Sequence, residues 1–421
     1  MLPLEFIRRN EAEVQRAADL KGEDAPLAEI LALDETWRAT LSRAESLKSE
    51  QNQHSKEFGR SKDQSLLPEM KRLAEESKQQ MAEADEMKER LDKLLLQVPN
   101  LFHPSVPIGE SEADNVVFAE WGEKRDFGFQ PRTHYDIGEA LGIMEFERPA
   151  KVAGSRFAGL RGAGAKLNRA LVQFMLDVHT EIHGYTELLP PFLVNSDSMT
   201  GTANLPKFGG DSFRLADRDL WLVPTAEVPV TNWHRDEILG ASDLPVRYVA
   251  YSPCFRSEAG SAGKDTRGYI RLHQFEKVEL VKLTTPETSL EELDSLVEDA
   301  SDILRRLEIP YRTLLMCSGD MGFAQYKKFD LEAWAPGLGR YLEVSSCSVF
   351  NDFQARRANL RYRPQAGAPP RFLHTLNGSG LALVRTLSCL IENNQQEDGS
   401  VAIPAALRPY MGGLERITAP R

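Results

Sequence analysis

The chain of 421 residues is 41% hydrophobic and 27% charged, a composition typical of a folded protein and not of a disordered one. Lys and Arg total 51 against 63 Asp and Glu, so the net charge of −12 argues against general affinity for nucleic acid, and no DNA partner is expected. The sequence contains no apolar run long enough for a bilayer span or a signal peptide, which predicts a cytoplasmic location and no membrane partner.

Residues from about 27 to 98 predict a long helical hairpin. Apolar or small residues recur at a spacing of three and four, first at Ile30, Leu33, Trp37, Thr40, Ala44 and Leu47. After the turn-forming segment FGRSKDQS the spacing returns at Met70, Leu73, Ser77, Gln80, Ala84, Met87, Leu91, Leu94 and Val98, and Pro99 ends the second helix. Two such helices favour an antiparallel coiled coil, which is either an oligomerisation hairpin or an arm that grips an elongated partner.

Residues 99–150 are rich in proline, glycine and charge, and we interpret them as a linker leading into the body of residues 151–421. In that body, RYVAYSPCF, GYIRLHQFEKVELVKL, YRTLLMC and GRYLEVSSCSVF have the character of strands. Helical stretches around 164–183, 289–307 and 380–394 interrupt the strands without alternating regularly with them. The pattern predicts an α+β body in which helices flank a largely antiparallel sheet.

Several patterns favour plain structural roles. In GLRGAGAKLN, Leu167 follows Lys166 where a phosphate loop needs Ser or Thr, so we expect a glycine-rich turn that enters a helix. His179 and His183 in HTEIH lack the zinc-protease spacing and are interpreted as surface histidines. The scattered cysteines are expected to be reduced and structural: Cys254, Cys317, Cys347 and Cys389. Two basic clusters could face nucleic acid or only solvent: Lys56, Arg60 and Lys62 near the hairpin tip, and Arg356, Arg357, Arg361 and Arg363.

The segment FRSEAGSAGKDTRGYIRLHQFEKVE alternates fixed charge with turn residues. Two strands joined by its glycine-rich loop would carry Arg256 and Glu258 on one strand, and Arg271, Phe275 and Glu279 on the other. Residues an even number apart on a strand point to the same face. One sheet face would then present a cation for phosphate, an aromatic ring for a base and carboxylates for an amine. The segment therefore predicts a site for a nucleotide and an amine.

Within this segment, FRSE and RLHQF resemble motif 2 of the class II aminoacyl-tRNA synthetases. GSGLALVR at 378–385 is similar to their motif 3, although Ala382 and Val384 depart from the class consensus in a way compatible with the seryl branch. GYTELLPPF, which contains Pro190, is similar to motif 1, which builds the dimer interface in that class. TAEVPVT, HQFEKVE, EVSSCS and TLNGSG follow in the order and spacing of the bacterial-type seryl-tRNA synthetases. The resemblance to that family covers essentially the whole chain.

The resemblance implies activation of L-serine by ATP to seryl-adenylate, followed by transfer to the 3′ end of tRNA(Ser) and also of tRNA(Sec). It implies that Arg256 and Arg385 are catalytic and hold the α- and γ-phosphates. The implied ATP-binding set is Arg256, Ser257, Glu258, Leu272, Phe275, Glu343, Val344, Ser345, Ser346 and Arg385, with Mg²⁺ at Glu343 and Ser346. The implied serine-binding set is Thr225, Ala226, Glu227, Arg256, Glu279, Asn377 and Ser379.

The resemblance also implies that residues 1–98 form a tRNA-binding domain and that the enzyme is a homodimer with Pro190 at its interface. Two alternatives remain at this point. One is a synthetase-like amino-acid:carrier-protein ligase, but such relatives are expected to lack the arm and to carry zinc. The other is a catalytically dead paralogue that binds partners through the coiled coil, against which the intact Arg256, Glu258, Glu279 and Arg385 argue.

Overall fold

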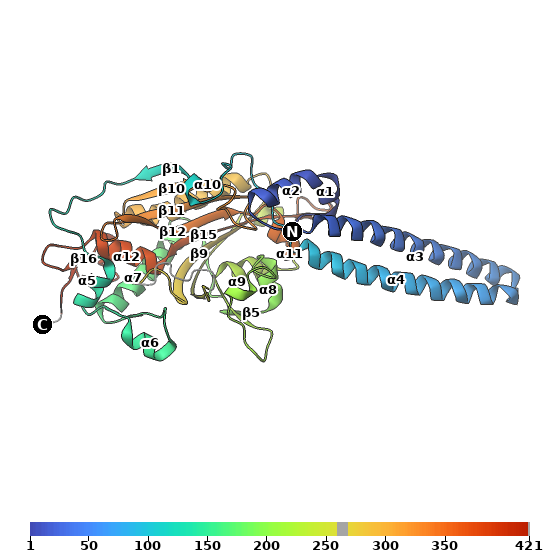
Figure 1. Ribbon diagram of the computed structural model, residues 1–421, viewed down its shortest axis with the longest axis horizontal. Coiled ribbons are helices and arrows are strands. Elements are labelled where there is room, and N and C mark those ends of the chain that lie inside the picture. The colour runs from blue at the N-terminus through green and yellow to red at the C-terminus, as the bar shows by residue number, and fades with distance from the viewer. Residues whose placement is uncertain (259–267, 420–421) are drawn as a thin grey trace. The chain divides into compact units, whose positions relative to one another are not determined.

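The computed structural model describes residues 1–258 and 268–419. The chain divides into two compact units, Met1–Pro99 and Asn100–Arg421, whose elements are labelled in Figure 1. Residues 259–267, which make up most of the predicted glycine-rich loop, lie outside the described residues. Among the helices formed by the described residues, none combines the length and the apolar character needed to cross a membrane.

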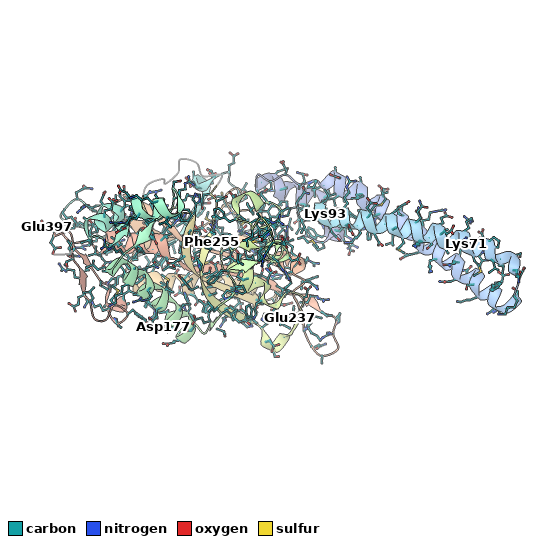
Figure 2. The ribbon with its side chains drawn as sticks, turned by 90° about the horizontal axis from the view of Figure 1, so that it is seen from below. Lys71, Lys93, Asp177, Glu237, Phe255 and Glu397 are labelled. Atoms are coloured by element: carbon teal, nitrogen blue, oxygen red, sulfur yellow. The ribbon has the colours of Figure 1, made fainter. Side chains whose placement is uncertain are left out.

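The first unit contains the predicted hairpin. After the short helices α1 (Leu4–Arg9) and α2 (Glu11–Leu20), the long helices α3 (Leu27–Ser61) and α4 (Leu67–Leu95) run side by side. Helix α3 continues about one turn beyond the predicted end near Lys56. It stops where Lys62 adopts a left-handed φ of 58° and the Asp63 side chain accepts a hydrogen bond from the Ser65 amide. Figure 2 draws the side chains along the hairpin, with the exposed Lys71 and Lys93 labelled on α4.

The predicted seam between α3 and α4 is confirmed, because every residue of the two stripes is buried or half-buried. Toward the tip the seam becomes polar, and the Ser77 hydroxyl donates to the Ala44 carbonyl at 3.1 Å. The sequence did not predict a role for Asp34, which is buried near the base of the arm. Its carboxylate pairs with Arg38 at 3.0 Å and with Arg8 of α1 at 3.4 Å, so two cations offset the loss of its hydration.

The second unit is built on an eight-stranded sheet in the order β1-β10-β11-β12-β15-β9-β8-β4. Only the pairing of β4 with β8 is parallel, which confirms the predicted antiparallel sheet of an α+β fold. The strands in sheet order are β1 (Val116–Trp121), β10 (Tyr311–Leu315), β11 (Lys327–Ala335), β12 (Arg340–Val349), β15 (His374–Ala382), β9 (Gln274–Thr284), β8 (Val246–Phe255) and β4 (Thr186–Glu187).

Three helices pack against this sheet and form the main core with it. They are α7 (Ala163–Glu181), α10 (Ser289–Arg306) and α12 (Leu383–Asn393), each within a few residues of a predicted helix. Their apolar faces bury leucines such as Leu171, Leu296 and Leu387 against the strands. Smaller elements complete the unit: β3 (Gly159–Leu160), β5 (Leu193–Val194), α8 (Ser196–Gly201), β6 (Trp221–Leu222), α9 (Glu227–Thr231), β7 (Ile238–Gly240), α11 (Phe353–Arg357), β13 (Arg361–Arg363), β14 (Arg371–Phe372), β16 (Val401–Ala402) and β17 (Arg416–Ile417).

Residues 100–150, which we expected to form a linker, fold as part of the second unit. The Asn100 side chain donates to the carbonyls of Ala324 and Phe350, both at 2.9 Å, and β1 forms the edge of the main sheet. Helix α5 (His134–Ala140) is tied to α12 through His134, whose Nδ1 lies 2.7 Å from Glu392 Oε1. β2 (Met144–Glu145) and α6 (Glu147–Ala153) follow. Residues 100–150 therefore consist of short elements held by the sheet and by α12, and Gly138 and Pro149 lie inside α5 and α6.

The patterns assigned to structural roles have mixed outcomes. The glycine-rich turn is confirmed: Gly162 has a φ of 54°, α7 begins at the next residue, and Lys166 donates to the Met411 carbonyl at 2.7 Å. All four cysteines are buried and unpaired, as predicted. The surface interpretation of HTEIH is wrong, because His179 is fully buried and His183 is half-buried.

The second basic cluster is not a free cationic surface. Arg356 pairs with Asp352 at 2.8 Å, and the Arg357 guanidinium lies 4.8 Å from the centre of the Phe353 ring. Burial lowers the pKa of Arg357 to about 9. These arginines hold together the packing around α11, which the charge pattern alone could not reveal.

Candidate active site

The segment around Phe255 and Gln274 forms the predicted pair of strands, but the strands are shorter than expected. β8 ends at Phe255 and β9 begins at Gln274. The prediction that Arg256, Glu258 and Arg271 lie on these strands is therefore wrong. The Arg256 amide still donates to the His273 carbonyl at 3.0 Å, while Glu258 has a left-handed φ of 52°. The chain turns here, and alternation along a strand therefore does not set the directions of these side chains.

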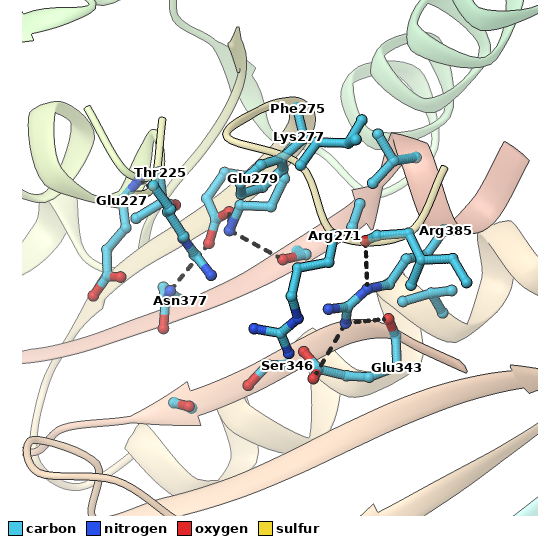
Figure 3. Close-up of a pocket in the computed structure, with 18 of the residues that line it drawn as sticks. Thr225, Glu227, Arg271, Phe275, Lys277, Glu279, Glu343, Ser346, Asn377 and Arg385 are labelled. Atoms are coloured by element: carbon cyan, nitrogen blue, oxygen red, sulfur yellow. Dashed lines mark hydrogen bonds and ion pairs between the residues drawn. The ribbon is translucent and has the colours of Figure 1, made fainter. Parts of the chain in front are cut away.

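A pocket of about 320 Å³ opens over β9, β12 and β15, beside the start of α12 (Figure 3). Most of the predicted site residues line it: Thr225, Glu227, Arg256, Glu258, Leu272, Phe275, Glu279, Glu343, Val344, Ser346, Asn377, Ser379 and Arg385. Phe275 and Glu279 both face the pocket from β9, as their even spacing predicts. Strands and a helix distant in sequence thus place charged and aromatic groups around one cavity.

Three predicted residues are not among those lining the pocket. Ala226 is fully buried in a neighbouring apolar cluster. The Ser257 hydroxyl donates to the Gly210 carbonyl at 2.9 Å, and the Ser345 hydroxyl donates to the Ser379 carbonyl at 2.6 Å. Ser345 therefore supports the strand that carries Ser379, while its neighbours Val344 and Ser346 line the cavity.

One end of the pocket is cationic. Arg385 Nη1 lies 2.8 Å from the Glu343 carbonyl oxygen and 3.4 Å from its carboxylate, while Arg385 Nε donates to the Ile270 carbonyl at 3.5 Å. Burial would raise the pKa of Glu343, but the charges of Arg385, Lys328 and Arg256 outweigh burial and hold that pKa below its usual value. Glu343 is therefore ionised, and the arginines remain able to meet further negative charge.

An aromatic and apolar wall lies beside the arginines. The Arg256 guanidinium is 5.2 Å from the centre of the Phe275 ring, and Leu272 and Val384 add apolar surface to the lining. Glu258 accepts a hydrogen bond from Arg271, which fixes its carboxylate at the edge of this wall. A flat base can stack against such a wall while a polar group reads its edge.

The other end of the pocket carries two carboxylates and their partners. Glu279 accepts from Asn377 Nδ2 at 3.0 Å and forms an ion pair with Lys277, whose Nζ also donates to the Ser379 hydroxyl at 3.3 Å. Burial and the charge of Glu279 raise the pKa of Glu227 to about 7. A cation that enters here would favour the ionised form of Glu227, so this end suits an ammonium group.

Sequence reasoning missed several pocket residues. Lys277 lies on β9 midway between Phe275 and Glu279, so the same alternation could have found it. Lys328 on β11 and Gln325 before it carry no local signal, because the sheet brings them to the pocket from a distant segment. Arg271 was predicted at the site and does line it, although it precedes the strand.

Glu343 and Ser346 offer a carboxylate and a hydroxyl to a divalent cation. Both face the pocket from β12, and the carboxylate of Glu343 remains partly exposed beside Arg385. No group of three or more His, Cys, Asp and Glu that could hold a metal occurs among residues 1–258 and 268–419. Mg²⁺ needs few protein ligands when phosphate and water complete its shell, so a carboxylate and a hydroxyl fit it.

An antiparallel sheet whose pocket joins phosphate-binding arginines, an aromatic wall and ammonium-binding carboxylates defines a class II aminoacyl-tRNA synthetase. In agreement, residues 213–394 match the model for the tRNA synthetase class II core domain of the G, H, P, S and T enzymes. Residues 1–102 match the model for the seryl-tRNA synthetase N-terminal domain.

Full-length relatives narrow the class to one family. A serine–tRNA ligase of Pelobacter propionicus is 54% identical over 99% of this chain and 100% of its own length, and one of Geobacter sulfurreducens is 53% identical over the same shares. The crystal structure of a Pyrococcus horikoshii seryl-tRNA synthetase complexed with ATP has a TM-score of 0.94 and 38% identity over 100% of both chains. A cytoplasmic enzyme of Naegleria fowleri in complex with AMP has a TM-score of 0.89 and 32% identity over 100% of this chain and 99% of its own.

The chain belongs to the seryl-tRNA synthetase family and is an aminoacyl-tRNA ligase. This confirms the resemblance seen in the motif 2 and motif 3 segments. The two alternatives, a carrier-protein ligase and an inactive paralogue, are not favoured.

Proposed function

We propose that the pocket activates L-serine with ATP and then passes the seryl group to the 3′ end of tRNA. One observation carries this assignment: a single cavity holds Arg256 and Arg385 at one end and the carboxylates Glu227 and Glu279 at the other. The arginines suit a triphosphate, and the carboxylates suit an amino-acid ammonium group. Relatives of the same length are serine–tRNA ligases, and one similar structure holds ATP.

In this proposal ATP lies along the cationic end and the aromatic wall. Arg256 holds the α-phosphate and Arg385 the γ-phosphate, while Phe275 stacks on adenine. Leu272 contacts the base through its backbone, and Glu258 accepts from the adenine amino group. Arg271 supports that role because its hydrogen bond fixes the Glu258 carboxylate. Glu343, Val344 and Ser346 line the phosphate side of the pocket. Ser257 and Ser345 lie outside the lining and support it through hydrogen bonds to the carbonyls of Gly210 and Ser379.

Serine takes the opposite end. Its ammonium group meets Glu227 and Glu279, and Thr225, Asn377 and Ser379 supply polar contacts, with Ala226 behind them. Glu279 is already bonded to Asn377 and Lys277, so the end of the pocket is preorganised around a hydroxyl-bearing substrate. Alanine would leave buried polar groups unpaired and is rejected strongly, whereas threonine must be excluded by steric fit.

Two group transfers follow from this arrangement. In the first, a serine carboxylate oxygen attacks the α-phosphorus, and the bond to the bridging oxygen breaks as pyrophosphate leaves. In the second, a ribose hydroxyl of the terminal adenosine of tRNA attacks the seryl carbonyl carbon, and AMP leaves. Catalysis comes from alignment and from charge stabilisation by Arg256, because no covalent bond to the protein is needed.

Glu343 and Ser346 would hold Mg²⁺ in this proposal. When bound, the ion would neutralise part of the negative charge of the triphosphate. The low pKa of Glu343 keeps its carboxylate available for this role at neutral pH.

Residues 1–98, the predicted tRNA-binding domain, would bind tRNA(Ser), and the same enzyme would also serve tRNA(Sec). Lys56, Arg60 and Lys62 stand exposed at the hairpin tip, where they can meet phosphates of an elongated RNA. The remaining acidity of the chain is compatible with this role, because positive charge is needed only along the bound RNA.

We further propose a homodimer that works in the cytoplasm. Pro190 is itself buried, but it stands beside Leu189, whose surface is 80% exposed. Ile182 and Leu193 in the same segment are also exposed, and a second copy could cover such apolar side chains. Residues 182–193 span the segment similar to motif 1.

The test measures serine-dependent ATP–pyrophosphate exchange and charging of total tRNA with each of the twenty amino acids in turn. We expect exchange and charging with serine alone. Exchange without any charging would contradict the tRNA acceptor, and charging with another amino acid would contradict the serine assignment.

A further inference from the structure

The HTEIH segment, which the active site does not use, forms a line of hydrogen bonds beneath β15. His179 Nε2 lies 2.9 Å from the carbonyl oxygen of Gly380, and His179 Nδ1 lies 3.0 Å from His183 Nδ1. His183 Nε2 in turn lies 3.0 Å from Asp302 Oδ2 on α10. Every ring nitrogen of the two histidines therefore has a partner.

The carbonyl at the end of this line belongs to Gly380, which lies at an irregularity of β15. The register of β15 with β9 shifts between Ser379 and Ala382, so Gly380 lies in a bulge. A Cβ at position 380 would come 2.6 Å from His179 Nε2, and only glycine leaves room for the imidazole. Ser379 before the bulge faces the serine end of the pocket, and Arg385 soon after it faces the phosphate end.

The number of ring protons follows from the chemistry of the partners. A carbonyl oxygen only accepts, so His179 Nε2 carries a proton. An ionised carboxylate also only accepts, so His183 Nε2 carries another. The two Nδ1 atoms face each other and share one hydrogen bond, which requires a third proton. Two neutral imidazoles hold only two protons between them.

We propose that His179 and His183 are positioning residues that hold three ring protons between them. This singly charged pair fixes the bulge of β15 that follows Ser379 and leads to Arg385. The role of that bulge rests on the proposed function of the pocket. The proton count does not, because it depends only on the partners of the four ring nitrogens.

The surrounding groups decide where the extra charge resides. Burial lowers the pKa of His179 to about 3, so His179 is the neutral ring of the pair. The count of three ring protons then leaves both nitrogens of His183 protonated. Burial would raise the pKa of Asp302, but hydrogen bonds from Arg306 and His183 outweigh it and keep the carboxylate ionised. Asp299 also faces His183, at 4.0 Å, and is shared with Lys282 and with the Tyr185 hydroxyl. Arg305 approaches Asp302 at 3.8 Å.

The first test reads the protons directly in the unchanged full-length protein. The chain has 8 histidines, so ¹⁵N-labelled histidine gives few ring signals, which single substitutions can assign. At neutral pH we expect His183 to have both ring nitrogens protonated and His179 to be the neutral tautomer with its proton on Nε2. Two neutral rings, with two protons in total, would overturn the proposal.

The second test compares substitutions that keep or remove one donor. Glutamine places its amide nitrogen near the Nε2 position of histidine, and asparagine places its own near Nδ1. His179→Gln should therefore keep the donor to Gly380, while His179→Leu removes it. We expect kcat/KM for serine-dependent exchange to fall at least about tenfold in the leucine variant, with higher KM for both serine and ATP, and less than about threefold in the glutamine variant.

A matched pair at the second histidine separates its two bonds. His183→Asn keeps a donor toward His179, whereas His183→Gln keeps only a donor toward Asp302. The asparagine variant should be the more active, because only it supports the ring that holds the bulge. Equal loss in both, or no loss in His183→Leu, would overturn the positioning role. His234→Leu is the control, since His234 also has two partners, Glu237 and Tyr248.

The two levels of the inference fail separately. Absence of serine-dependent exchange in the unchanged protein would contradict the proposed function, yet the ring protons would still be measured. Three ring protons together with unchanged kinetics in all five variants of His179 and His183 would confirm the charge state and overturn its role in the active site.

Discussion

The hairpin arm and the active-site pocket are built in opposite ways. The seam of the arm follows one short-range periodicity, and the residues that this periodicity selects are the ones buried or half-buried between α3 and α4. The pocket collects side chains from β9, β11, β12, β15 and α12, and no periodicity relates Glu227 to Arg385. Changes in the arm should therefore act gradually along its length, whereas one change in the pocket can remove a whole function.

The two regions also use charge differently. In the arm, ion pairs such as Arg72 with Glu69 lie on the surface one helical turn apart and contribute little individually. In the pocket, Glu227, Glu279 and Glu343 lie among cations, and burial shifts the pKa of Glu227 to about 7. Charge in the arm therefore lies on solvated helix faces, whereas charge in the pocket lies where burial and neighbouring charges change its pKa.

The largest expected effect comes from shortening the arm. Ser77 bonds to the Ala44 carbonyl, so residues 45–76 can be removed and the two helices joined there by a short glycine turn. We expect tRNA charging to fall at least about a thousandfold, because the contacts to an elongated RNA are lost. Serine-dependent exchange should stay within about twofold, since the pocket is complete without the arm. Charging at normal efficiency would contradict the separation of the two regions.

Removing one charge from the pocket tests the opposite half of the comparison. Arg256→Ala should lower serine-dependent exchange about a thousandfold, the size expected when a group that stabilises the transition state is lost. The circular dichroism spectrum and the oligomeric state should not change. Arg218→Ala, an exposed arginine outside the pocket, is the control. Surviving exchange activity would show that Arg256 has another role.

The charges at the arm tip should have a smaller and graded effect. Replacing Lys56, Arg60 and Lys62 by alanine should raise KM for tRNA about tenfold and flatten its dependence on salt, since each lost phosphate contact reduces that slope by about one. Exchange should be unaffected. Alanine at three exposed basic residues of the body should change neither quantity: Arg148, Lys151 and Arg218. A salt slope equal to that of the control would contradict tip contacts with phosphate.

The smallest effect concerns pH and belongs to Glu227. Burial and the charge of Glu279 raise its pKa in the folded protein from the ordinary 4.5 to about 7, so folding favours the protonated form. This contribution to stability is complete below about pH 4.5 and is lost as the pH rises through about 7. Serine should favour the ionised form, so KM for serine should fall severalfold between about pH 6 and pH 8.

Glu227→Gln is the matched variant for this effect, because it keeps the shape of the side chain and cannot ionise. We expect a higher KM that no longer changes over the same pH range, together with a midpoint of thermal unfolding that depends less on pH. A pH dependence equal to that of the unchanged protein would assign the titration to another group.

The sequence by itself determined much of this protein. The stripes from Ile30 to Val98 predicted the arm, because a helix repeats its contacts every few residues. The strings around Phe255 to Glu279 and around Arg385 pointed to the family and to most of the residues that line the pocket. Such strings carry information about distant parts of the fold, since their residue types serve one site only when the fold brings them together.

Only the tertiary structure decided the rest. Residues 100–150 looked like a linker, yet β1 and α5 gain their stability from pairing with β10 and packing on α12, which no local pattern encodes. Lys328 reaches the pocket, and His179 meets Gly380, from segments far away in the sequence. Their burial and their charge depend on which neighbours the sheet brings to them, and the order of strands in space is not written in any one stretch of the chain.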